Sequence, residues 1–328
     1  MSKKIKRKTS IKSSILVLLL MAILLISSTY AWFTANQTVT ISTLNVNVVA
    51  QNGLQISADG KEWKAVLGNE DIMPGEGLNA SYSGNSNQIP ESLVPVSSIG
   101  DVVDGKMAMF KGTVTSDENP DSDTYGKYVL SSTKSSESRG TTGDFIAFDL
   151  FLKVDADTEI VLASGSDVTA GANDKGLKNS ARVAFVTAAD DDVKAAGAAV
   201  SDIQSVVPSV TYIWEPNTNV HTAAALSHAA SNYGLADLTS STVLTSYNGL
   251  KDVTTTPLLL DSTDENVFEA VTPAYKTLEN NEVDTDVFTL KAGITKVRVY
   301  MWVEGQDIDC ENTASGTDIN FDIQFQVK

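Results

Sequence analysis

The C-terminal stretch "DINFDIQFQVK", Asp318 to Lys328, alternates strictly between polar and apolar residues. Its apolar positions share one side and its polar positions the other, a period of two that is typical of a β-strand with one face in a core. Strands of this kind occur in antiparallel sheets that have one solvated face. The apolar side consists of Ile319, Phe321, Ile323, Phe325 and Val327.

The same period recurs along the chain, in segments separated by clusters of Gly, Asn, Asp and Ser. This arrangement predicts an all-β protein, a jelly-roll-like antiparallel β-sandwich. A turn at Asn52-Gly53 is expected between two of the strands. The strand positions are Leu44, Val46 and Val48; Leu54 and Ile56; Phe148, Leu150, Leu152 and Val154; 181–188; 209–214; and Val297, Val299, Met301 and Val303.

Long polar insertions separate these strands, and a few short helices are expected within them. Ser116 to Gly143 reads as an exposed loop or hairpin, Ala189 to Ile203 as a loop with a short helix, and His221 to Tyr233 as one or two helical turns. No Pro- or Gly-rich linker divides the body, so residues 32–328 are expected to form a single elaborated domain, with its insertions mainly within 100–285.

The N-terminus has the pattern of an export signal. Six basic residues up to Lys12 precede the apolar run Ile15 to Ile26, and small residues follow at Thr29 and Ala31. This pattern predicts a signal peptide over residues 1–31, cleaved between Ala31 and Trp32. The alternative is a retained membrane anchor, because the chain is uncharged over 19 residues as far as Phe33. In either case the body is expected outside the membrane, secreted or at the cell surface.

The body is strongly acidic. Without its first 31 residues the chain has 18 basic and 41 acidic residues, a net charge of −23. Such a surface repels phosphate backbones, so nucleic acid is excluded as a partner, and membrane contact is expected only through the N-terminal segment. The single cysteine, Cys310, allows no intramolecular disulfide and no cysteine-based zinc site.

Motifs for catalysis are absent from the sequence. It contains no HExxH, GxSxG, P-loop or GxGxxG, and its only histidines are His221 and His228. We expect these two to be surface residues without a ligand role. The sequence therefore predicts a protein that is not an enzyme and needs no cofactor. An extracellular hydrolase with an unmarked Ser–His–acid triad stays as a minor alternative.

Three acidic stretches are candidates for cation binding. Asp117, Asn119, Asp121 and Asp123 stand at alternate positions, as ligands do in calcium loops, but the stretch lacks the glycine and the glutamate of an EF-hand. A solvated loop is expected there and at 190–192. Asp307 and Asp309 are expected to cap backbone N–H groups in a hairpin loop, with cation binding as the alternative.

The leader and first strand resemble the exported fibre proteins of Gram-positive bacteria typified by TasA and camelysin, whose signals are removed by a SipW-type signal peptidase. The matching pieces are "TYAWFTANQTVTI" (29–41) and "STLNVNVVA" (42–50). Farther on, "IWEPN" (213–217) and "WVEGQDIDC" (302–310) look like elements of large clostridial relatives with such leaders.

The resemblance implies a jelly-roll subunit of a cell-surface or biofilm-matrix fibre. Its partners would be copies of itself, the signal peptidase during export, and other matrix proteins. Assembly would proceed by donor-strand complementation, in which the freed N-terminal segment adds a strand to the next subunit. The apolar residues of that donor segment are Trp32, Phe33, Val39 and Ile41.

Two alternatives to this assembly follow from the residues. The N-terminal segment could instead pair within its own subunit, and the protein could instead be a membrane-anchored adhesin whose insertions bind a ligand. The body is also larger than a simple TasA-type subunit, which leaves the insertions without an assigned role. The metallopeptidase activity attributed to some camelysin relatives is not transferred, because no zinc motif is present.

Overall fold

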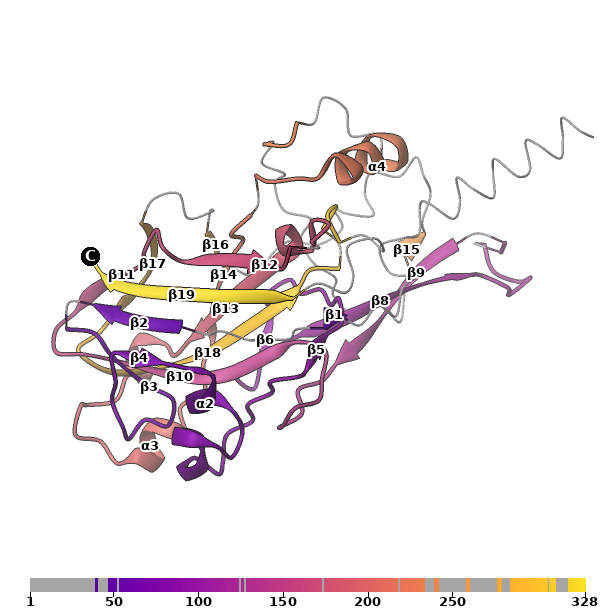
Figure 1. The fold of residues 1–328 in the computed structure, drawn as a ribbon. Helices are drawn as coiled ribbons and strands as arrows, with labels where there is room; N and C mark the ends of the chain where they lie inside the picture. The colour runs from indigo at the N-terminus through magenta and orange to yellow at the C-terminus, as the bar shows by residue number, and fades with distance from the viewer. Residues whose placement is uncertain are drawn as a thin grey trace, which may run out of the picture.

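The computed structural model describes residues 39–40, 47–51, 53–123, 125–126, 128–172, 174–217, 219–233, 239–241, 258–259, 276–278, 284–305, 307–310 and 318–328. Two β-sheets dominate this part of the chain (Figure 1). We call them the β18 sheet and the β19 sheet after their long central strands. The all-β class predicted from the alternating segments is thus confirmed.

The β18 sheet has the strand order β16-β14-β13-β18-β10-β3, and the β19 sheet has the order β17-β11-β19-β2-β4, with β12 also paired to β19. The strands of the β18 sheet are β16 (Lys276–Leu278), β14 (Val210–Trp214), β13 (Ala181–Thr187), β18 (Gly293–Val303), β10 (Ile146–Val154) and β3 (Gln55–Ser57). Those of the β19 sheet are β17 (Thr285–Leu290), β11 (Thr158–Leu162), β19 (Ile319–Val327), β2 (Asn47–Gln51), β4 (Val66–Leu67) and β12 (Asp167–Ala170).

The main core fills the space between these two sheets. Every second residue of β10 and β18 joins it, among them Phe148 and Val299, and from the other sheet come Phe321 and Phe325 of β19. The rings of Phe185, Phe288 and Phe325 meet there, with the Phe185 and Phe325 centroids 5.2 Å apart. The alternation quoted for the last eleven residues therefore places its apolar side in the core, as predicted.

Two strand pairs are parallel, which corrects the expectation of a purely antiparallel sandwich. β2 lies parallel to β19, with Asn47 opposite Asp322, and β14 lies parallel to β16. A hairpin turn forces antiparallel pairing on neighbours in sequence. β2 and β19 come from opposite ends of the chain, so no turn constrains their direction.

The β18 sheet is covered on both faces, whereas its alternating sequence predicted one solvated face. All eleven residues of β18 are buried. The face turned away from the main core packs on Val96, Met109 and Phe145 in one cluster and on Ile203 in another. This cover comes from β6 (Val102–Val103), β7 (Lys106–Met107) and α3 (Val200–Gln204). The other short elements add to the main core instead, through Ile72 of α2 (Asn69–Ile72), Leu78 of η1 (Gly77–Ser81) and Leu93 of β5 (Ser92–Leu93).

The insertions adopt the kinds of structure that their sequences indicate. β8 (Met109–Ser116) and β9 (Tyr128–Ser135) form a hairpin ribbon that runs away from the sandwich (Figure 1), and the two-residue β15 (Leu258–Leu259) pairs with β9. The segment after β13 contains η3 (Asp190–Asp192) and then α3, and η2 (Leu177–Ser180) precedes β13. α4 (Ala223–Tyr233) is longer than the one or two turns expected.

None of the helices in the described ranges is long and apolar enough to cross a membrane. The signal peptide or anchor expected over residues 1–31 lies outside those ranges.

Candidate functional site

The N-terminal donor segment is described at two positions, Val39 and Thr40. They form β1, which pairs antiparallel with β5 of the same chain, Val39 opposite Leu93 and Thr40 opposite Ser92. The cleavage residues Ala31 and Trp32 lie outside the described residues, as do Phe33 and Ile41 of the donor segment. In this single chain, then, β1 has the own-subunit pairing named above as an alternative to donor-strand exchange.

A buried group of charges, which we call the Arg298 cluster, lies on the face of the β18 sheet turned away from the main core. It consists of Arg298 and Lys296 of β18, Asp149 of β10, and Glu137. The Arg298 guanidinium lies 2.7 Å from Asp149 and 2.8 Å from Glu137, and the Lys296 ammonium lies 3.2 Å from Asp149. Two buried cations thus face two buried carboxylates, and the exposed Lys106 lies 3.4 Å from Glu137, a balance that allows the carboxylates to be buried.

Hydroxyl groups complete the hydrogen bonding of this cluster. Tyr82 donates to Asp149 at 2.8 Å, and Tyr300 donates to Glu137. Burial by itself raises the pKa of Asp149, but the attraction of Arg298 and Lys296 outweighs it, so that the pKa lies below its ordinary value. Asp149 is thus held charged, and both carboxylates accept hydrogen bonds from Arg298 and from a tyrosine, an arrangement suited to fixing β10 against β18.

A second group of charges, the Arg182 cluster, joins the two sequence motifs that resemble clostridial relatives. Arg182 of β13 lies 2.6 Å from Asp307 and 3.5 Å from Glu215, and His221 Nδ1 lies 2.7 Å from Asp309. Glu215 belongs to "IWEPN", and Asp307 and Asp309 belong to "WVEGQDIDC". All five side chains are buried. The two motifs therefore meet in space although about ninety residues separate them.

The position of His221 corrects a prediction. We expected a surface residue, but His221 is only 8% exposed and contacts Asp309 just before α4 begins. The α4 sequence alone could not show this, because the partner carboxylate comes from a distant loop. The side chain of His228, which lies within α4, is outside what the structure describes.

The predicted capping by the two aspartates of "WVEGQDIDC" is confirmed. Asp307 accepts a hydrogen bond from the backbone N–H of Asp309 at 2.9 Å, and Asp309 accepts one from Thr222 at 2.9 Å. Burial raises the pKa of Asp307 above its ordinary value against the opposing attraction of Arg182, and the charge of Asp309 raises it further. Cys310 beside them is a buried free thiol whose pKa burial raises.

The other acidic stretches form turns. In the ribbon tip, Asp117 accepts from the backbone N–H of Asn119, and Asn119 accepts from that of Asp121, as Asx turns do. Asp190 to Asp192 form one turn of 3₁₀ helix with all three side chains exposed. Across the described ranges, no group of three or more His, Cys, Asp or Glu side chains is arranged to hold a metal ion.

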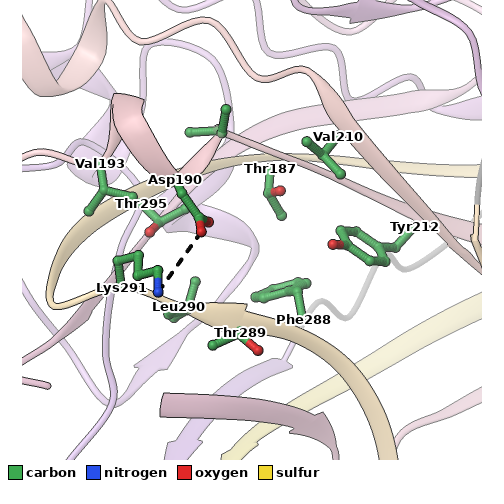
Figure 2. Close-up of a pocket in the computed structure, with 12 residues that line it drawn as sticks. Thr187, Asp190, Val193, Val210, Tyr212, Phe288, Thr289, Leu290, Lys291 and Thr295 are labelled. Atoms are coloured by element: carbon green, nitrogen blue, oxygen red, sulfur yellow. Dashed lines mark ion pairs between the residues drawn. The ribbon is translucent and has the colours of Figure 1, made fainter. Parts of the chain in front are cut away.

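A pocket of about 220 Å³ opens where the two sheets part, between β13 and β14 on one side and β17 on the other. Figure 2 shows Tyr212 and Phe288 on one side of it and Asp190 and Lys291 on the other. The Tyr212 and Phe288 ring centroids lie 5.7 Å apart. The Lys291 ammonium lies 4.0 Å from Asp190 and 3.0 Å from Asp157 outside the pocket. No sequence motif marks this pocket, because its walls come from four separate segments.

Burial, and then the charge of Asp190, raise the pKa of Tyr212 above its ordinary value, so its hydroxyl is neutral and can donate a hydrogen bond.

No family model matches the chain, and comparisons with curated proteins and with solved structures find no match either.

Proposed function

We propose that the protein is a secreted structural subunit of a cell-surface or biofilm-matrix fibre, with its two-sheet sandwich as a jelly-roll-like building block. The N-terminal export pattern and its resemblance to TasA-type leaders support export. Structural support for the proposal comes from the way in which β1 is held.

The observation that carries the proposal is the small extent of the β1–β5 pairing. Among the described residues it covers two positions of β1, whereas β10 and β18 pair over nine and β8 and β9 over eight. β2, by contrast, is built into the β19 sheet beside the C-terminal strand. Val39 and Thr40, the described residues of β1, are thus joined to β5 by few backbone hydrogen bonds, and the free energy lost on releasing them is small.

A contact of this kind can be made equally well between two copies. Suppose that β1 leaves its own β5 and pairs with β5 of the next copy in the same register. Val39 then still lies opposite Leu93 and Thr40 opposite Ser92, so the exchange forms the same contact between two chains that the single chain forms within itself. Repeated from copy to copy without reciprocity, such an exchange is heterologous and gives an open filament. This is donor-strand complementation with β5 as the acceptor.

Electron microscopy of the exported protein tests this proposal. We expect filaments from the wild type, and we expect Val39→Asp to abolish them, because a charge is introduced into the donated strand. Val103→Asp is the matched control, since Val103 is 56% exposed in the β6–β7 hairpin; this variant should form filaments like the wild type. Monomers from all three proteins would contradict the proposal.

A surface-anchored binding module is the second candidate, and the pocket beside Tyr212 favours it. The two candidates are compatible, since a fibre subunit can also bind a ligand. Mass spectrometry of protein recovered from cells separates the two forms of the N-terminus: the fibre proposal expects Trp32 as the first residue, whereas a retained anchor leaves residues 15–32 in place.

A further inference from the structure

We propose that the pocket between β14 and β17 is a binding site for a neutral saccharide, one sugar ring at a time. This inference is independent of the fibre proposal, because the pocket is formed within a single chain and is not lined by β1 or β5. It rests on the size of the pocket, on the side chains that line it, and on a buried hydroxyl that lacks a partner.

The size fits a small ligand. At about 220 Å³ the pocket is smaller than the roughly 300–1,000 Å³ typical of sites for drug-sized molecules. Since water occupies about 30 Å³ per molecule in the liquid, the space corresponds to about seven waters. This is room for a single six-membered ring with its substituents and too little for a nucleotide or a peptide segment.

The walls combine aromatic rings with hydroxyl groups. Tyr212 and Phe288 present rings from neighbouring sheets, and Thr187 and Thr289 also line the pocket (Figure 2). Aromatic rings offer large apolar contact area, and tyrosine adds a polar tip. A sugar ring has the matching properties, with C–H groups on its faces and hydroxyl groups around its rim.

Charges at the mouth favour a neutral ligand. Lys291 lies between Asp190 and Asp157, so one cation faces two carboxylates there. The body as a whole is acidic, and it repels anions. Asp190, the carboxylate that lines the pocket, is already paired with Lys291, so it is not free to bind a cationic ligand. A hydroxyl group, in contrast, can accept from Lys291 and donate to Asp190.

Thr295 supplies the independent observation. It lines the pocket, it is 3% exposed, and its Oγ1 has no hydrogen-bond partner in the described part of the chain. Buried hydroxyl groups almost always have a partner, so one without a partner requires an explanation. The threonine side chain rotates about a single bond, χ1. A change of rotamer would let Thr295 Oγ1 form a hydrogen bond with a ligand hydroxyl in the pocket.

The test is a titration of the full-length protein with methyl α-glucoside, methyl β-galactoside and N-acetylglucosamine, followed by saturation-transfer NMR, with choline chloride as the cationic comparison. We expect saturable binding of at least one saccharide in the millimolar range, and none of choline. Absence of saturable binding of all three saccharides, or binding of choline in their place, would overturn the inference.

Variants locate the binding. Thr295→Val keeps the shape and removes the hydroxyl, so it should fold normally and weaken saccharide binding about threefold to tenfold, the effect of losing one hydrogen bond. Tyr212→Ala should abolish binding, and Tyr212→Phe should retain most of it. Tyr125→Ala is the matched control, because Tyr125 is exposed on the ribbon tip. Unchanged affinity in both Thr295→Val and Tyr212→Ala would show that the sugar binds elsewhere.

Discussion

Arg298, Asp149 and Glu137 show how single residues fix this fold. Their side chains are 3%, 4% and 2% exposed, and the guanidinium is shared by both carboxylates. An intact buried cluster of this kind adds little net stability, because desolvation offsets the attraction, but the loss of one member leaves an uncompensated charge. Substitutions of single residues in the Arg298 cluster therefore test the packing on the outer face of the β18 sheet most directly.

Arg298→Met should lower the free energy of unfolding by about 3 kcal/mol, because Asp149 and Glu137 stay buried and lose their shared cation. Lys296 beside Asp149 and the exposed Lys106 beside Glu137 compensate for only part of this loss. Urea unfolding followed by tryptophan fluorescence measures this change. Lys328→Met is the control, since Lys328 is exposed where it pairs with Asp286, and its unfolding midpoint should match the wild type. Equal midpoints for both variants would show that the Arg298 cluster is not buried as described.

The stability contributed by Asp149 should depend on pH. Its pKa in the folded state lies below the ordinary value of 3.8, so its contribution is complete above that pH and is lost as the pH falls through the folded-state pKa. The difference in unfolding free energy between wild type and Asp149→Asn should therefore be constant from pH 7 to about 5 and should narrow below about 4. A difference that widens as the pH falls would contradict this assignment.

At the scale of elements, β19 shows what the sequence could predict. Its alternation of apolar and polar residues located the strand and its core face correctly, because the outer face of the β19 sheet carries polar side chains. The parallel neighbour β2 could not be predicted from either strand, since pairing direction between chain ends depends on the whole topology.

β10 and β18 show where the sequence was insufficient. The residues between their core positions include Asp149, Phe151, Arg298 and Tyr300, which alternation assigns to a solvated face. The aromatic residues and the opposite charges on that face indicate that it is buried, because a solvated face rarely carries several aromatic residues. The pocket could not be predicted from the sequence either. Its lining residues lie on or beside β13, β14, β17 and β18, and the order of these strands in the two sheets brings them together.

Phe325→Ala should cost about 3–5 kcal/mol of unfolding free energy, because its ring contacts both Phe185 and Phe288 in the main core. Gln326→Ala, one residue on and facing outward, should change it by less than about 0.5 kcal/mol. Urea titration of both variants measures the pair. Similar losses at the two positions would show that β19 is paired in another register, since a shift by one residue exchanges its faces.

At the scale of the whole molecule, net charge governs how copies approach each other. A body with a charge of −23 repels its own copies, and this repulsion extends about 30 Å at 0.01 M salt but about 8 Å at 0.15 M. We expect filament formation, followed by light scattering and electron microscopy, to be faster at 0.15 M than at 0.01 M sodium chloride. Assembly that slows as salt is added would indicate subunits held mainly by opposite charges.

The most direct test of the central claim asks whether β1 pairs with β5 of its own chain or of another. Thr40→Cys and Ser92→Cys place two thiols at opposed positions of this pairing, at a separation that antiparallel partners allow for a disulfide, while Cys310 is buried. Equal amounts of isotopically heavy and light protein carrying both substitutions are assembled, oxidised and digested, and the linked peptides are analysed by mass spectrometry. The fibre account predicts that heavy–light linked peptides are about as abundant as linked peptides of one isotope. Linked peptides of a single isotope only would contradict it, because every β1 would then be paired within its own chain.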